Sequence, residues 1–306
     1  MPSLKDSALQ KAHQFEYWTT VWLHHLPPAR SRSVFVLGYP KSGTNWCCNL
    51  LSACLDLPVY EFWKQRGPVL VPSILHLHRF ATVPHRTIYV VRDGRDIAVS
   101  YYFAYVRDLQ LGFLPSLEAS CPRPITAEHV RDNLPGFIRY LFASSRVSAI
   151  PYDRHLQRAK RLGLFRVRYE DLLSGAETAL KSILSFLKEE RVSETKIRAA
   201  MDRHDFKQVT GREHGTEDGT DFMRKGIAGD WQNHFSAEAA PKFTAYLLGA
   251  TDAIRKRLGN SAHDQLRSRL VDAIDLHERT GSLESHKHWI RALLSDYYDP
   301  MYNYQL

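Results

Sequence analysis

Residues 37–46, LGYPKSGTNW, bring a lysine, two hydroxyl side chains and two glycines into one short stretch. Gly38 and Gly43 have the spacing of the ATP-binding pattern GxxxxGK(S/T), but Lys41 lies inside the loop instead of after the second glycine. Backbone N–H groups from Ser42 to Asn45 would open a helix and face an oxyanion, aided by the helix dipole. The stretch therefore predicts an anion-binding loop without the lysine–serine pair that grips a nucleoside triphosphate and its magnesium.

The elements that must position this loop alternate between strands and helices. Short apolar runs predict strands at 34–37, 87–91 and 164–168. Helices are expected, in chain order, at 44–55, 96–105, 128–146, 153–162, 177–189, 236–257 and 262–278. Residues 110–127 and 211–230 are expected to be long irregular segments. This alternation predicts an α/β fold with a mostly parallel sheet that helices cover on both faces.

The composition is that of an ordinary globular chain, with 44% apolar and 24% charged residues among 306. The formal net charge of +8 suits an anionic ligand, a nucleic acid or a membrane surface without choosing among them. No apolar run approaches the ~18 residues of a membrane span, and the N-terminus lacks the apolar core of a signal peptide. The four cysteines include no CxxC pair, so we expect reduced thiols, no metal site and a cytoplasmic location.

The string YPKSGTNW at residues 39–46 resembles the 5′-phosphosulfate loop of cytosolic-type sulfotransferases. These enzymes move a sulfuryl group from 3′-phosphoadenosine 5′-phosphosulfate (PAPS) to an alcohol, phenol or amine. Further strings resemble family segments in the same order, namely YVVRDGRDIAVSYY at 89–102, RVRYEDL at 166–172 and FMRKGIAGDWQNHFS at 222–236. The likeness covers about residues 33–250. It implies a three-layer αβα, P-loop NTPase-like fold in a single sulfotransferase domain over residues 1–306, in which 258–306 form a helical extension of unknown role.

The resemblance implies PAPS as the sulfuryl donor and indicates which residues would contact it. They are Lys41, Ser42, Gly43, Thr44, Asn45, Trp46, Arg92, Ser100, Tyr169, Phe206, Phe222, Met223, Arg224, Lys225 and Gly226. The 3′-phosphate carries close to two negative charges, and the guanidinium forks of Arg92 and Arg224 suit it. For Arg92 the alternative is a surface salt bridge with Asp93 or Asp96. Arg95 is the arginine that we expect in solvent.

By the same resemblance, Trp46 and Phe206 take the two faces of the adenine, and ordinary core packing is the alternative for each. The family usually has small hydroxyl residues just before this phenylalanine, where the present chain has His204 and Asp205. The edge of the base would then be recognised differently.

Sulfuryl transfer resembles phosphoryl transfer in its loose transition state, so positioning and electrostatics dominate. Lys41 would stabilise the leaving phosphate, and a histidine suits the general base because its unperturbed pKa lies near neutrality. The family places this base in a K-x-H string, which His76-Leu77-His78 matches here. We therefore expect His78 to be the base. His76 replaces the family's lysine and would donate to sulfuryl oxygens when protonated or act as an alternate base; a structural role is the alternative for both histidines.

The expected reaction converts a hydroxyl or amine of a small, apolar or aromatic acceptor into its sulfated product and releases 3′,5′-adenosine bisphosphate (PAP). Variable loops build the acceptor pocket in this family, and the candidates here are residues 1–32, 60–75, 105–127 and 211–222, which include many aromatic side chains. We expect no nucleic-acid partner and no membrane partner. A homodimer is one option for the assembly.

Three alternatives remain from the sequence. A P-loop nucleotide kinase would share the fold, but no GK(S/T) string and no magnesium-holding acid can be placed. The tail HWIRALLSDYYDPMYNYQL resembles the C-terminal segment of tRNA 2-selenouridine synthases over about 15 residues, but we expect instead an amphipathic helix and an aromatic strand that pack on the domain or on a second subunit. A protein that keeps the PAPS pocket and has lost catalysis is the third.

Overall fold

The computed structural model describes residues 32–61, 71–80, 86–110, 121–143 and 152–235, together with residues 19 and 23. The chain divides into two compact units. The first comprises residues 1–92 and 163–216, and the second comprises residues 93–162 and 217–306. The helices expected at 236–257 and 262–278 lie outside the described residues. The single domain over the whole chain stays a prediction.

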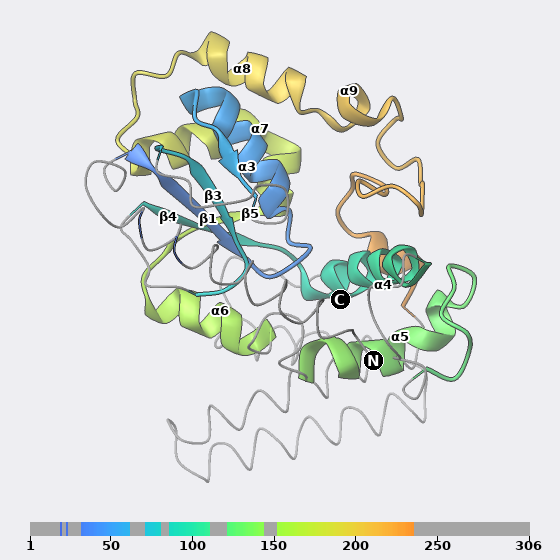
Figure 1. The fold of residues 1–306 in the computed structure, drawn as a ribbon. Coiled ribbons are helices and arrows are strands. Elements are labelled where there is room, and N and C mark those ends of the chain that lie inside the picture. Colours follow the sequence, from blue (N-terminus) through green and yellow to red (C-terminus); the bar gives the residue numbers. More distant parts are fainter. Residues whose placement is uncertain are drawn as a thin grey trace, which may run out of the picture. The chain divides into compact units, whose positions relative to one another are not determined.

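A five-stranded sheet forms the centre of the first unit (Figure 1). Its strand order is β2-β3-β1-β4-β5, and every neighbouring pair is parallel. The strands are β1 (Val34–Gly38), β2 (Val59–Tyr60), β3 (Ile74–Leu77), β4 (Thr87–Val91) and β5 (Phe165–Arg168). The three predicted strands are confirmed, and so are the α/β class and the parallel sheet. The sequence interpretation missed β2 and β3, because the first has two residues and a histidine interrupts the apolar pattern of the second.

Helices of the first unit are α3 (Thr44–Leu55), α7 (Tyr169–Phe186), α8 (Glu194–Arg203) and α9 (Phe206–Thr210). Helices α3, α7 and α8 lie on the same side of the sheet (Figure 1) and enclose one apolar core with its alternate residues, such as Val34 and Val36. Helix α3 has the expected bounds. Helix α7 begins eight residues earlier than the expected 177, but its backbone is non-helical at Gly175, so two helical stretches meet at a kink and the second one agrees with the expectation. Helices α8 and α9 were not predicted.

Helices of the second unit are α4 (Gly94–Gln110), α5 (Val130–Ala143) and α6 (Tyr152–Arg161), followed by the short 3₁₀ helix η2 (Asp230–Asn233). Helices α4 and α5 pack together through Tyr102 and Phe137, whose rings meet edge-on with centroids 5.2 Å apart. The Tyr102 hydroxyl donates to the carbonyl oxygen of Thr126 at 2.8 Å and accepts from the amide of Asn133 at 3.0 Å. The three predicted helices are confirmed with shifted ends.

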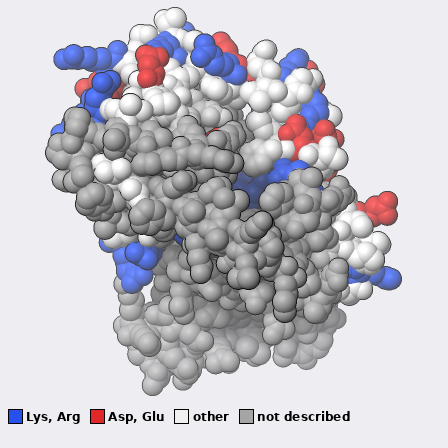
Figure 2. Space-filling view, in the orientation of Figure 1, with Lys and Arg blue, Asp and Glu red and all other residues white. Residues whose placement is uncertain are grey.

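Charged side chains of both signs are interspersed over α8, at the top of the view in Figure 2. Ion pairs join Lys181 to Glu177 at 2.9 Å and to Glu194 at 2.6 Å. This part of the surface is therefore not a patch of one sign. In the part of the chain that the structure describes, no helix has the length and apolar character to cross a membrane.

Candidate active site

The anion-binding loop joins β1 to α3, and both of its glycines are required by close packing. A Cβ atom on Gly38 would lie 2.5 Å from Ser42 Oγ and 2.9 Å from the Val90 carbonyl oxygen. Gly43 has a φ of 91°, and a Cβ atom there would lie 2.4 Å from the ring of Tyr169. Real Cβ contacts are never so short, so only glycine lets the chain turn here.

Inside the loop, the backbone is fixed by its own hydrogen bonds. The N–H and Oγ–H groups of Ser42 both donate to the carbonyl oxygen of Tyr39, at 3.1 and 2.7 Å. The guanidinium of Arg92 donates to the carbonyl oxygen of Lys41 at 3.2 Å. Lys41 itself has a φ of 72°, which is unusual for a residue with a side chain. The loop therefore holds its lysine in one backbone conformation.

The N-terminus of α3 is arranged for an anion. Its N-cap is Gly43, no side chain caps it, and its first turn contains no acidic residue. The first intrahelical bond runs from the N–H of Cys47 to the carbonyl oxygen of Gly43, so the N–H groups of Thr44, Asn45 and Trp46 have no partner within the helix. An anion here would meet these N–H groups, the helix dipole and the charge of Lys41.

Two histidines at the end of β3 bind opposite ends of this loop. Nδ1 of His78 lies 2.8 Å from the carbonyl oxygen of Gly38, and Nε2 of His76 lies 2.6 Å from Oγ1 of Thr44. Because a carbonyl oxygen only accepts, His78 carries its proton on Nδ1 and its lone pair on Nε2. Burial, aided by the charge of Lys41 and opposed by the Gly38 bond, lowers the pKa of His78 to about 4. The His78 ring is therefore neutral at pH 7.

The aromatic residues of the first unit gather behind the loop. Trp46 donates its indole N–H to the carbonyl oxygen of His204 at 2.9 Å, and its ring meets the edge of Tyr169. The guanidinium of Arg92 lies 4.2 Å from the centroid of the Tyr169 ring, a cation–π contact. Phe206 is buried at the start of α9. The structure thus brings together the loop, both histidines, Arg92, Trp46 and Tyr169 as one site in the first unit.

Asp205, one of the two departures from the family pattern, has a structural role. Its carboxylate accepts hydrogen bonds from the N–H groups of Lys207 and Gln208 and so caps α9. The ring of His214 lies 3.1 Å from the same carboxylate. These bonds fix the backbone directly before Phe206.

In the second unit, Arg224 and Lys225 surround a buried carboxylate. Both donate to Asp230, which is 3% exposed, and the Lys225 bond measures 2.7 Å. Glu217 binds Arg224 on its other side at 2.7 Å. Burial disfavours the ionised carboxylate of Asp230, but hydrogen bonds from His234, Arg224 and Lys225 outweigh it and hold its pKa well below the usual range. This network therefore orders Arg224 and Lys225, the two cations that the family resemblance assigns to the 3′-phosphate.

The expectation that Arg95 lies in solvent is wrong. Its side chain is 4% exposed, pairs with Asp93 at 2.5 Å and lies 3.7 Å from the centroid of the Trp231 ring. Asp96 accepts the backbone N–H groups of Gly229 and Trp231. Asp93 and Asp96 thus have structural partners in their own unit, and the assignment of Arg92 to the nucleotide stays a prediction.

The remaining predicted residues also lie in the second unit. Ser100 is on α4, and Gly226, with a φ of 64°, follows Lys225. Phe222 is 54% exposed, and the guanidinium of Arg107 lies 5.6 Å from the centroid of its ring. Met223 donates its N–H to the carboxylate of Asp221 at 3.0 Å.

Sequence reasoning missed the roles of three acidic residues that shape these segments: it named Asp96 only as an alternative partner of Arg92 and did not single out Glu217 or Asp230. Two of these roles could have been found, because Asp96 and Asp230 lie inside the strings that resemble the family and are close in the sequence to arginines. Glu217 precedes its string by five residues and gives no such signal. Among the described residues, no three His, Cys, Asp or Glu side chains are grouped to hold a metal ion.

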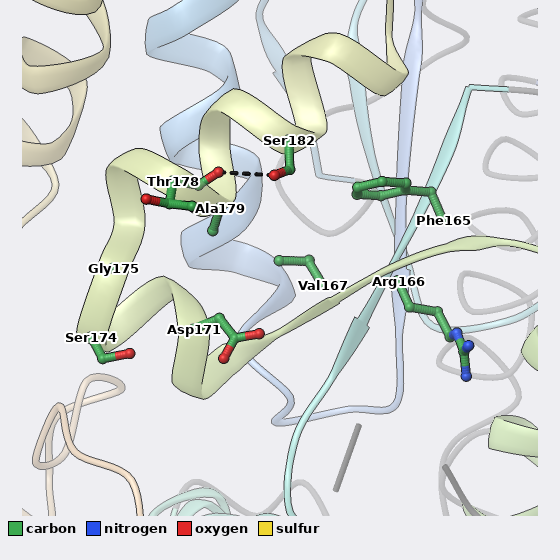
Figure 3. A pocket seen from close by; sticks show the side chains of 9 residues that line it. All are labelled: Phe165, Arg166, Val167, Asp171, Ser174, Gly175, Thr178, Ala179 and Ser182. Carbon is green, nitrogen blue, oxygen red and sulfur yellow. Dashed lines mark hydrogen bonds between the residues drawn. The ribbon is translucent and has the colours of Figure 1, made fainter. Parts of the chain in front are cut away.

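A shallow groove of about 360 Å³ runs between β5 and α7 (Figure 3). Its lining is polar on the helix, with Ser174, Thr178 and Ser182, and includes Phe165 from the strand. None of the predicted site residues lines it. The groove is therefore separate from the anion-binding loop.

The sheet is parallel, and its first strand leads into a loop that turns at two glycines. These features define a P-loop-like α/β protein. The family model described as a sulfotransferase domain matches residues 68–254. The chain belongs to the sulfotransferase family. Sulfotransferase 2A6 of Mus musculus is 24% identical over 257 residues, which cover 72% of this chain and 85% of that protein.

Solved sulfotransferase structures share the fold. Mouse sulfotransferase SULT7A1 complexed with PAP has a TM-score of 0.53 and 21% identity, with 84% of this chain and 95% of that chain covered. Retinol dehydratase in complex with androsterone and inactive cofactor PAP has a TM-score of 0.54 and 17% identity, with 79% and 85% covered. The P-loop-like α/β fold is thereby confirmed.

A second likeness concerns the C-terminal part. The family model described as the tRNA 2-selenouridine synthase AAA domain matches residues 206–306. The tRNA 2-selenouridine synthase of Marinobacter nauticus is 58% identical over 64 residues, and that of Alcanivorax borkumensis is 50% identical over 60. These stretches cover 21% and 20% of this chain but 17% of each synthase, so the chain spans under a fifth of the length of these relatives. The sequence pattern of the tail had indicated a resemblance over about 15 residues, whereas the family model matches residues 206–306.

Proposed function

We propose that the protein transfers a sulfuryl group from PAPS to a hydroxyl or amine of a small acceptor and releases PAP. The observation that carries the proposal is the hydrogen bond between His78 and Gly38, at 2.8 Å. It joins a neutral base to the first residue of the loop that contains Lys41. A base for the acceptor and a cation for the leaving group therefore belong to one local structure.

The residues present fit the 5′ end of PAPS. The turns at Gly38 and Gly43 leave no room for a Cβ atom, and the first turn of α3 contains no acidic residue of its own, although the side chain of Asn45 in that turn donates to Glu61 at 2.7 Å. An anion is the ligand that suits such a helix start. The assignment of the 3′-phosphate to Arg92, Ser100, Arg224 and its two following residues, and of the adenine to Trp46 and Phe206, is part of the same proposal.

Each catalytic residue has one defined task. When bound, PAPS supplies the sulfuryl group and a phosphate leaving group. His78 accepts the acceptor's proton on Nε2 while the acceptor oxygen or nitrogen forms its bond to sulfur. Lys41 and the N–H groups of α3 stabilise the electron pair that remains on the phosphate oxygen when the S–O bond breaks. The hydrogen bond from Nδ1–H to the Gly38 carbonyl oxygen orients the His78 ring. It also keeps the proton of the neutral ring on Nδ1, so that Nε2 is left to accept the acceptor's proton.

The acceptor is proposed to be small and apolar or aromatic. Retinol dehydratase has been crystallised with androsterone and with retinol, which are compounds of this kind. A cytoplasmic location, a homodimer and the absence of a metal remain parts of the proposal drawn from the sequence.

Thermal unfolding with added ligands tests the nucleotide site without knowledge of the acceptor. PAP at 100 times its dissociation constant should stabilise the protein by ~2.7 kcal/mol, whereas AMP and ADP with magnesium should not. The variant Arg92→Gln should lose most of this shift, and Arg198→Gln, which changes an exposed arginine on α8, should keep it. Stabilisation by ADP with magnesium and not by PAP would refute the proposal and favour a nucleotide kinase.

We propose a second, separate function for the C-terminal part, namely binding of transfer RNA. The supporting observation is the match of residues 206–306 to the family model described as the tRNA 2-selenouridine synthase AAA domain, together with the 58% identity over 64 residues to one such synthase. The stretch Arg255-Lys256-Arg257 supplies adjacent cations, and nucleic-acid affinity depends mainly on such contacts with phosphates. This candidate departs from the expectation of no nucleic-acid partner.

Binding of fluorescent tRNA to the full chain, at several salt concentrations, tests this second function. Replacing residues 255–257 by alanine should weaken binding about tenfold or more and reduce the salt dependence. The matched control replaces Arg158, Lys160 and Arg161, three exposed cations of α6, and should leave the affinity unchanged. Equal losses in both variants, or no preference for tRNA over poly(U), would contradict a specific RNA site.

A further inference from the structure

Thr44 and His76 form a buried polar pair at the centre of the loop. Oγ1 of Thr44 lies 2.6 Å from Nε2 of His76, and both side chains are buried, with His76 4% exposed. Thr44 follows Gly43 directly and so stands where the ATP-binding pattern has its phosphate-gripping lysine. A neutral hydroxyl therefore occupies a place where many anion loops have a cation.

The direction of this hydrogen bond decides what Thr44 can do. If the hydroxyl donates to His76, its only proton is used and its oxygen lone pairs face the anion site. If Nε2–H of His76 donates to Thr44, the hydroxyl proton remains available for an anion. The second arrangement is favoured once an anion binds, because an oxyanion repels a bare lone pair and attracts a hydroxyl proton.

We propose that His76 is a positioning residue that acts through Thr44: Nε2–H of His76 donates to Oγ1 of Thr44, and the Thr44 hydroxyl donates to the 5′-phosphate group of the nucleotide. This inference rests on the proposed function. These two consecutive hydrogen bonds direct the Thr44 hydroxyl proton toward the anion. They do so without placing a second full positive charge beside Lys41. Hydrogen bonds in such a chain polarise and strengthen one another.

The two neighbouring histidines then hold opposite tautomers. His78 carries its proton on Nδ1, because that atom faces the Gly38 carbonyl oxygen, and His76 carries its proton on Nε2. Their ring centroids are 4.6 Å apart, with His76 inside β3 and His78 directly after the strand's last residue. Two adjacent imidazoles thus serve two tasks, since one presents a lone pair for the acceptor's proton and the other presents an N–H group to the loop.

Calorimetric titration with PAP tests the relay without any turnover. Thr44→Val and His76→Phe should each weaken PAP binding about tenfold, the loss expected for a hydrogen bond to a charged group. The double variant should be no weaker than either single one, because both substitutions break one chain. Thr44→Ser and His76→Gln, which keep the hydroxyl and an N–H donor, should stay within about threefold of the wild type.

A second ligand and a spectrum separate this role from a structural one. Adenosine 3′-monophosphate lacks the 5′-phosphate, so Thr44→Val should leave its affinity unchanged. Long-range ¹H–¹⁵N spectra of the PAP-bound wild type should show His76 protonated on Nε2. Additive losses in the double variant, equal losses for both ligands, or a proton on Nδ1 of His76 would overturn the relay while leaving the proposed function intact. A wild type that does not bind PAP would overturn both.

Discussion

The carboxylate of Asp96, in the first turn of α4, accepts a hydrogen bond from the backbone N–H group of Gly229 at 2.8 Å. A second bond, from the N–H of Trp231, measures 3.0 Å. Asp96 is buried, so these bonds hold the segment that contains Arg224 and Lys225 against α4. Asp96→Asn removes the charge and turns an amide N–H₂ toward one of the N–H groups. We expect it to lower the stability by about 1–3 kcal/mol, measured by urea unfolding.

The control for this variant is Asp132→Asn on α5. Asp132 is exposed and reaches Arg123 only at 3.9 Å, so its removal should change the stability by less than about 0.5 kcal/mol. Equal effects of the two substitutions would show that the backbone bonds to Asp96 contribute little.

The pKa of His78 gives a pH dependence with a definite sign. Because burial lowers this pKa from 6.5 to about 4, the base is already deprotonated at pH 5. We expect kcat/KM for the acceptor to show no loss from His78 titration between pH 6 and 8 and to fall as the pH approaches 4. An inflection near pH 6.5 assigned to His78 would contradict the described environment.

The same depressed pKa makes folding stability fall as the pH drops from 6.5 through 4, since the unfolded chain then binds the proton more readily.

Replacing His78 separates catalysis from nucleotide binding. His78→Gln should keep a side-chain N–H donor for Gly38 but has no basic nitrogen, so we expect turnover to fall about 10²- to 10⁴-fold. PAP should stabilise this variant against heat as it stabilises the wild type. Unchanged turnover would mean that another group accepts the proton.

Much of the fold follows from local patterns, and the omissions have local causes. Strand β4, TIYVV, is β-branched and uncharged, so its pattern alone identifies it. Strand β3 contains His76, whose burial depends on Thr44, a residue 32 positions away. Helix α7 was expected only from 177, and since the backbone is non-helical at Gly175, the part that was missed is the first helical stretch from Tyr169 to this break.

The site was predictable as a set of residues but not as a set of contacts. The string around Lys41 contains the loop that turns between β1 and α3. The bond of Trp46 to His204 spans 158 positions, and the contact of Arg95 with Trp231 likewise depends on the tertiary fold. Arg95 was expected in solvent because a sequence shows its charge and not the ring that covers it.

Lys41 combines a catalytic charge with an uncommon backbone conformation, and the two can be tested together. Lys41→Gly removes the ammonium group, so turnover at saturating substrates should fall about 10²- to 10³-fold. Glycine adopts a φ of 72° without steric cost, so the melting temperature should not decrease. Lys188→Gly is the matched control, because Lys188 has a φ of 59° and no assigned role, and it should leave turnover unchanged.

The ionised state of Asp230 should make stability depend on pH in the acid range. A carboxylate whose pKa is lowered on folding contributes stability that is present above its unfolded pKa and is lost as the pH falls. Asp230→Asn removes the buried anion of Arg224 and Lys225 and leaves only the partly exposed Glu217 beside them, so the variant should unfold at a lower urea concentration at pH 7. The difference from the wild type should shrink when both are unfolded at pH 3. A difference that does not vary with pH would show that packing, and not charge, accounts for the effect.

Glu217 competes for the cations that the proposed function assigns to the 3′-phosphate. Its carboxylate, 34% exposed, lies 2.7 Å from Arg224 and 3.5 Å from Lys225. A bond from the N–H of Asp218 to the carbonyl oxygen of Arg224, at 2.9 Å, keeps the carboxylate beside the guanidinium. A phosphate that approaches Arg224 must displace this carboxylate or meet its repulsion. Glu217→Gln should therefore tighten PAP binding about threefold to tenfold in calorimetric titrations at low salt.

Glu213→Gln provides the comparison for that variant. Glu213 is an exposed acid that pairs with Lys207, and neither residue is assigned to the nucleotide. Its substitution makes the same change in net charge, so it separates the local competition from a general electrostatic effect. Tighter binding in Glu217→Gln alone would place the 3′-phosphate beside Arg224. Equal gains in both variants would instead mean that overall charge governs the affinity and that Arg224 need not contact the phosphate.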